Sequence, residues 1–158
     1  MSSQVQVIRP VSIVDDISPL GYHRYAKQFH SAGQFIFPEK VFSPVRYYLY
    51  CRALELVLKS FLLAKGVTKS RLKRRDLGHN LESILGLAEQ YGITDVLEIS
   101  YQDRAIIAAA NKAYLSKVFE YFDVDSALGG YRNLPDLSRM SDLVGRLLDK
   151  VQNQLVRK

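Results

Sequence analysis

The chain contains few of the residues that crosslink a small protein or bind a metal. It has one cysteine, Cys51, among 158 residues, so no internal disulfide can form. Cys51 lies in a largely apolar run, where a free cysteine is usually a buried, inert thiol, and this usage suits a reducing compartment. The three histidines, His23, His30 and His79, form no Cys/His ligand pattern, so we expect no metal and no other cofactor.

Long apolar runs are missing as well. The most apolar stretch, Tyr47–Leu63, is interrupted by Arg52, Glu55 and Lys59, whereas a membrane span needs about 20 mostly apolar residues. The first residues lack the basic segment and apolar run of a secretion signal, so we expect a cytoplasmic protein with no membrane span. There is also no glycine-rich phosphate loop and no Gly-x-Ser-x-Gly nucleophile motif.

Helical periodicity is the main pattern that the chain does contain. Its 47% apolar content over 158 residues favours one folded domain with a sizeable core. Ser18-Pro19 and Ser43-Pro44 are typical helix starts, since serine is a favoured N-cap and proline a favoured first residue. We predict helices at about 18–36, 43–65, 80–91, 94–121 and 135–155, separated by loops that include 66–78 and 123–133.

These helices predict an all-α fold, an antiparallel up-and-down bundle of four to five helices over residues 18–158. One apolar face of the first helix is predicted from spacings of three and four between Tyr22, Tyr25, Phe29, Ala32 and Phe35. Residues 1–17 are predicted to form a loosely packed N-terminal arm with a weak strand signal. The alternative is that this arm packs on a second subunit.

Charge is unevenly placed along the chain. Residues 1–79 contain 13 Lys or Arg against 5 Asp or Glu, whereas residues 80–158 contain 9 against 11. The excess is concentrated in Lys65–Arg75, which has no acidic residue. A local basic field of this kind attracts phosphates, although such runs also occur as solvated loops. We predict RNA or phosphate binding through Lys69, Arg71, Lys73 and Arg75.

Three segments carry a resemblance to a known family. Residues 48–91 read YLYCRALELVLKSFLLAKGVTKSRLKRRDLGHNLESILGLAEQY, a long helix with Glu55 and Lys59, then a basic linker, then Gly-His-Asn-Leu at the next helix start. Residues 111–121 read NKAYLSKVFEY, and residues 130–135 read GYRNLP. Over roughly residues 20–155 the chain resembles the HEPN family of bacterial and archaeal helical domains.

The resemblance implies a helical bundle that often dimerises and is linked to RNA. Many HEPN proteins are metal-independent ribonucleases of toxin–antitoxin or defence systems, with an Arg followed after four to six residues by a His, and two subunits contribute to one site. Arg74 and His79 match this spacing. His79 would take a proton from a ribose hydroxyl, and Arg74 would stabilise charge on the phosphate. Asn80, Tyr114 and Tyr131 are supporting candidates, the tyrosines as surfaces on which a base stacks.

A structural interpretation of the same residues remains open. His79 or Asn80 can start the third helix by bonding its free N–H groups. Glu55 and Lys59 have the spacing of a helical ion pair, and Asn111 and Tyr114 share a helix face, so both pairs can be structural. The alternative function is therefore a non-catalytic dimeric module whose basic loop binds an acidic partner protein, such as a paired antitoxin or nucleotidyltransferase.

Overall fold

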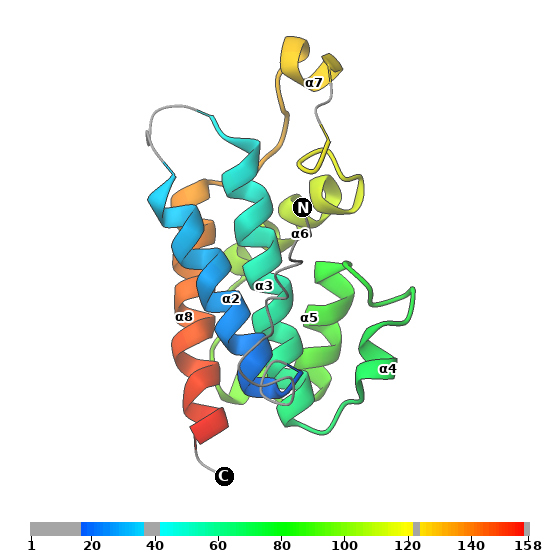
Figure 1. The fold of residues 1–158 in the computed structure, drawn as a ribbon, viewed down its shortest axis with the longest axis vertical. Coiled ribbons are helices and arrows are strands. Elements are labelled where there is room, and N and C mark those ends of the chain that lie inside the picture. Colours follow the sequence, from blue (N-terminus) through cyan, green and yellow to red (C-terminus); the bar gives the residue numbers. More distant parts are fainter. Residues whose placement is uncertain (1–16, 37–41, 122–123, 157–158) are drawn as a thin grey trace, which may run out of the picture.

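The computed structural model describes residues 17–36, 42–121 and 124–156, and over these ranges every regular element is helical. The predicted all-α class is confirmed. The predicted N-terminal arm, apart from Ile17, lies outside the described residues. Figure 1 shows the α-helices, which are α2 (Pro19–Phe35), α3 (Pro44–Ala64), α4 (Lys69–Leu72), α5 (Leu81–Gln90), α6 (Tyr101–Leu115), α7 (Val124–Gly129) and α8 (Leu137–Val156). A short 3-10 turn, η1 (Ile93–Asp95), follows α5 in the chain.

Helix α3 is the centre of the fold. It packs against α2, α5, α6 and α8, and its second half is buried on all sides. Figure 1 shows α2 running opposite to α3, and α8 running in the same direction as α3. The core forms where the apolar side chains of these helices meet; its largest fully buried members are Tyr50, Phe61, Leu54, Leu58, Leu62, Leu81, Ile84, Ile93, Ile107, Met140, Leu143 and Leu147. Charged residues on α3 are therefore held at fixed positions within a packed interior.

The predicted starts of the first three helices are confirmed. The Ser18 hydroxyl accepts a hydrogen bond from the Gly21 N–H, and the Ser43 hydroxyl accepts one from the Arg46 N–H. Asn80 begins α5 in the same way, because its side-chain oxygen accepts from the Ser83 N–H. Each bond satisfies an N–H group that the first turn of a helix leaves without a partner.

The buried face of helix α2 is not the face that carries its predicted apolar stripe. Its buried residues are Gly21, His23, Ala26, His30 and Gly33, whereas Tyr25, Ala32 and Phe35 are exposed and Tyr22 and Phe29 are partly exposed. Small residues allow a close approach to α3, and a methyl group added at Gly33 would lie 2.5 Å from Tyr50 Cε1. The two histidines donate to α8, to the carbonyls of Leu148 (2.8 Å) and Ser141 (2.9 Å). An aromatic stripe is thereby left at the surface.

The predicted fourth helix is too long at both ends. Residues 93–95 form only the turn η1, and α6 begins at Tyr101 because Ser100 and Asp103 form a reciprocal capping box. It ends at Leu115, where Lys117 adopts a positive φ of 59° that a helix cannot continue. The predicted loops at 66–78 and 123–133 each contain a short helix, α4 and α7.

None of the described helices combines the length and the apolar character that crossing a membrane requires.

Candidate functional site

The carboxylate of Glu55 gathers donors from three parts of the fold. Arg52 Nη1 donates to both of its oxygens at 3.0 Å, and Lys59 Nζ donates to Oε1 at 2.7 Å. From outside α3, the Tyr114 hydroxyl donates to Oε2 at 2.7 Å, and His79 Nδ1 lies 2.9 Å from the same oxygen. We call Arg52, Glu55, Lys59, His79 and Tyr114 the Glu55 cluster. It joins α3, the residue preceding the α5 cap, and α6.

Glu55 is ionised within this cluster although its side chain is only 1% exposed. Burial opposes the charge, but the cations of Lys59 and Arg52 and the hydrogen bonds outweigh burial and hold the pKa of Glu55 below its usual value. Burial and the nearby carboxylate raise the pKa of Tyr114, so its hydroxyl stays protonated and donates. The carboxylate can therefore act only as an acceptor.

The ionised carboxylate also decides the tautomer of His79. Because Glu55 Oε2 can only accept, the bond at 2.9 Å requires the proton on Nδ1. In the neutral imidazole the lone pair is then on Nε2, and the His79 side chain is 60% exposed. A buried acid orients an exposed imidazole with its basic nitrogen unpaired among the described residues, which is the arrangement of a general base.

Two further contacts fix the backbone on either side of His79. Lys59 Nζ donates to the Gly78 carbonyl at 2.6 Å. On the other side, the Asn111 amide oxygen accepts from the Leu81 N–H at 2.8 Å, while its nitrogen donates to Asn80 Oδ1 at 3.2 Å. Asn111 is 3% exposed, so α6 clamps the start of α5 from the interior. His79 is consequently held by its neighbours as well as by Glu55.

A surface pocket of about 570 Å³ opens beside the cluster. Its polar lining residues are Arg52, Glu55 and Lys59 of α3, and His79. Apolar side chains complete the lining: Ile17, Tyr22, Tyr25, Phe29 and Leu56. Cationic and aromatic groups thus face the same space as His79.

The basic linker lies apart from this pocket. Arg71 Nη1 pairs with Asp76 at 2.9 Å, and Arg74 Nε lies 3.6 Å from the same carboxylate. The Arg74 side chain is 68% exposed, and among the described residues no hydrogen bond joins it to His79. Lys73 and Arg75 are exposed, and Lys69 is partly exposed on α4. The arginine that lies next to His79 in the structure is Arg52, whose Nη1 is 3.5 Å from His79 Nδ1.

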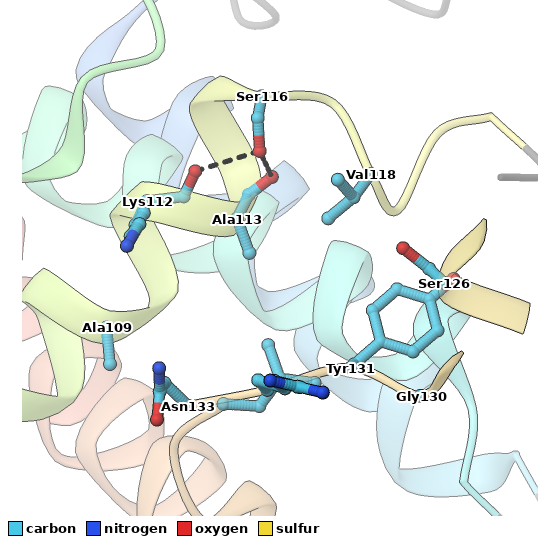
Figure 2. A pocket seen from close by; sticks show the side chains of 11 residues that line it. Ala109, Lys112, Ala113, Ser116, Val118, Ser126, Gly130, Tyr131 and Asn133 are labelled. Carbon is cyan, nitrogen blue, oxygen red and sulfur yellow. Dashed lines mark hydrogen bonds between the residues drawn. The ribbon is translucent and has the colours of Figure 1, made fainter.

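The two tyrosine candidates occupy different environments. Tyr114 is 3% exposed, with Tyr48 and His79 against its ring, so it offers no open face to a base. Tyr131 lines a separate pocket of about 390 Å³ at the end of α6, which Figure 2 shows with Lys112, Ser116 and Val118 around it. No residue lines both this pocket and the one beside His79.

Sequence reasoning assigned no role to Arg52, which lies 27 residues before His79. The available signal was its position three residues before Glu55, a spacing that places two side chains on one face of a helix.

Among the described residues, no group of three or more His, Cys, Asp or Glu side chains could hold a metal ion. Comparison of the chain with protein-family models, curated proteins and solved structures finds no match.

Proposed function

We propose that this protein is a HEPN-like helical bundle that cleaves RNA without a metal ion, with His79 as the general base. The observation that carries the proposal is the 2.9 Å bond between His79 Nδ1 and the buried Glu55 carboxylate, together with the exposed ring. This orientation directs the basic Nε2 away from the core, where a ribose hydroxyl can reach it. The resemblance to the HEPN family, many of whose members are metal-independent ribonucleases, adds to the proposal.

The reaction is an internal transesterification. Nε2 of His79 takes the proton of a ribose 2′-hydroxyl as that oxygen forms a bond to the adjacent phosphorus. The bond from phosphorus to the 5′-oxygen breaks, and the leaving oxygen takes a proton from water. The hydroxide so formed takes the proton from Nε2, which restores the neutral His79 and the water. The products are a 2′,3′-cyclic phosphate and a 5′-hydroxyl, so no oxidant, reductant or metal is consumed.

Arg52 is the better-placed cation for the phosphate. Charge builds on the phosphate oxygens during the reaction, and a nearby guanidinium stabilises that charge. Arg52 lines the pocket with His79 and uses Nη1 for Glu55, while a guanidinium presents further N–H groups in its fork. Lys73 and Arg75, which are exposed, would then contact the backbone of the RNA away from the cleaved bond.

The test is cleavage of single-stranded and structured RNAs by purified protein in the presence of EDTA. His79→Ala is expected to abolish cleavage, and Arg52→Gln to reduce it about a hundredfold or more, a size typical of losing one charge-stabilising donor. Arg74→Ala is expected to have a small effect, and Lys150→Ala, which removes an exposed cation from α8, no effect. All variants are first shown to be folded.

Two outcomes contradict the proposal. The first is wild-type protein that cleaves none of these RNAs, and the second is cleavage that survives His79→Ala. Loss of cleavage in Arg74→Ala with full activity in Arg52→Gln would reassign the phosphate role to Arg74. Product ends are identified by mass spectrometry, where a 3′-phosphate without a cyclic precursor would contradict the mechanism.

A second candidate function is a non-catalytic module that binds an acidic partner protein, such as an antitoxin or nucleotidyltransferase. The exposed side chains of Lys73, Arg74 and Arg75 favour this candidate. Asp76 is shared between Arg71 and Arg74, so most of the positive charge at this turn is available to an acidic partner. Neutralising Lys73 and Arg75 together would then abolish capture of the partner, whereas His79→Ala would not. RNA cleavage that requires His79 would decide against this candidate.

The HEPN resemblance also makes a homodimer part of the proposal. Sedimentation at micromolar concentration is expected to show a species of twice the 18.0 kDa chain mass. A single species at the monomer mass would remove a shared site between subunits from the proposal, while the Glu55–His79 pair lies wholly within one chain.

A further inference from the structure

The aromatic stripe of α2 forms a wall of the pocket beside His79. Tyr22, Tyr25 and Phe29 lie three and four residues apart, so they share one face of the helix. All three line the pocket that also contains Arg52 and His79. The opposite face of α2, with His23, Ala26 and His30, is the one buried in the fold. Tyr25 is exposed, and Tyr22 and Phe29 are partly exposed beside it, so the three rings form an aromatic surface that a ligand can contact.

The chemistry of this pocket suits one nucleotide. Aromatic rings stack on the flat face of any base, and they are the usual platform for unpaired bases in RNA-binding proteins. The cations of Arg52 and Lys59 line the same pocket, where a phosphate attached to that base would be attracted. The volume of about 570 Å³ falls within the roughly 300–1,000 Å³ typical of small-molecule sites.

We propose that this pocket binds an unpaired base next to the phosphate that is cleaved, so that the protein selects single-stranded RNA. The inference rests on the proposed function for the identity of the ligand as RNA. Bases in a duplex are stacked and paired, so they present no free face to Tyr25 or Phe29. Selection therefore follows from the fold itself, because the fold leaves Tyr25 exposed and Phe29 partly exposed at this pocket.

Tyr25 is the residue that tests the inference with least damage to the fold. It is 43% exposed, whereas Tyr22 and Phe29 are partly buried against the core. Tyr91, also 43% exposed, ends α5 and does not line the pocket, so Tyr91→Ala is a matched control for the loss of an exposed tyrosine. Tyr25→Phe keeps the ring and removes only the hydroxyl.

The experiment measures binding without cleavage. The probe is a 2′-O-methyl RNA oligonucleotide that carries 2-aminopurine, whose fluorescence falls when the base stacks on an aromatic ring. This probe lacks the nucleophilic hydroxyl, so it cannot be cleaved. We expect quenching and tight binding for the single strand, and at least tenfold weaker binding for the same sequence in a duplex. Tyr25→Ala should raise the single-strand Kd about tenfold and remove the quenching. Tyr25→Phe and Tyr91→Ala should match the wild type.

Equal affinity for single strand and duplex would overturn the inference, as would unchanged binding and quenching in Tyr25→Ala. Failure of the proposed function has a different signature. In that case the probe is still bound and quenched in a Tyr25-dependent manner, but unmodified RNA of the same sequence is not cleaved. Cleavage without stacking would refute the inference and leave the ribonuclease proposal intact.

Discussion

Two buried carboxylates in this fold are similar in burial and in having a lowered pKa but differ in the side chains that donate hydrogen bonds to them. Glu55 and Asp103 are 1% and 5% exposed, and each is paired with an arginine. Burial opposes ionisation at both, and hydrogen bonds and cations overcome it, so the pKa of each lies below its usual value. Asp103 receives its bonds from Ser100 and from Arg146 of α8, which close the start of α6. Glu55 receives one of its bonds from an exposed imidazole.

This difference distinguishes Asp103, which has a structural role, from Glu55, which belongs to a candidate functional site. The donors of Asp103, Ser100 and Arg146, cap a helix and attach it to α8. Asp103 and Arg146 also line a surface pocket of about 590 Å³, but neither of these donors is a side chain that readily takes a proton from a ligand. His79 uses one nitrogen on Glu55 and leaves the other at the surface beside a pocket. Both carboxylates line a pocket and the pKa of each is lowered, so these features are insufficient to identify a site, and the exposed imidazole bonded to Glu55 makes the difference.

The largest effect on stability is expected from Glu55→Gln. Arg52 and Lys59 would keep their charges in the protein with no carboxylate between them, and removing one partner of a buried ion pair typically costs about 3–5 kcal/mol. Urea denaturation at pH 7 measures the free energy of unfolding. Glu98→Gln, at an exposed position, is the control and should stay near the wild type. A loss for Glu55→Gln as small as that of the control would contradict a buried, ionised Glu55.

The stability difference between wild type and Glu55→Gln should depend on pH. Because the folded protein lowers the pKa of Glu55, its contribution is fully present above the ordinary value of 4.5 and is lost as pH falls through the lowered pKa. The difference should be smaller at pH 3 than at pH 5. A difference that grows from pH 5 to pH 3 would mean that the folded state raises this pKa.

Asp103→Asn should cost less, about 1–2 kcal/mol. It weakens one capping box and one ion pair whose arginine is 39% exposed, and hydrogen bonds from Ser100 can persist to the amide oxygen. RNA cleavage should be unaffected once the variant is folded. A loss of cleavage comparable with that of His79→Ala would remove the distinction between the two carboxylates.

The smallest effect on stability is expected from His79→Ala, about 0.5–1 kcal/mol. The side chain is 60% exposed, and Glu55 keeps the hydrogen bonds from Arg52, Lys59 and Tyr114. Thermal denaturation should therefore show a nearly unchanged protein, while cleavage of RNA is lost. Destabilisation as large as that of Glu55→Gln would indicate that His79 acts chiefly as a structural residue.

Local sequence signals predicted the helices better than their contacts. Ser18 and Ser43 mark helix starts because a cap involves residues three positions apart. The capping box of Ser100 and Asp103 is equally local and was readable, but the apolar rhythm that continues on both sides of α6 masked it. The buried face of α2 was not predictable from its apolar residues, because it is set by close approach at Gly33 and by histidine bonds to α8 carbonyls.

The candidate site was predictable only in part for the same reason. The pairing of Glu55 with Lys59 followed from spacing along the chain, whereas His79 became a candidate through the resemblance to the HEPN family. The bonds from His79 and Tyr114 to Glu55 span 24 and 59 residues, so only the packing of α5 and α6 on α3 brings them together. Arg74 has the right spacing from His79, but its side chain turns to Asp76.

The thiol of Cys51 can report how often the core of this fold opens to solvent. It is the one cysteine in the chain, it is 0% exposed on α3, and burial, with the nearby Glu55 charge, raises the pKa of its thiol. Only the thiolate reacts with alkylating reagents, so labelling must wait until the core around α3 separates. The rate of alkylation therefore measures how often the centre of the molecule opens, in unmodified protein and without an added probe.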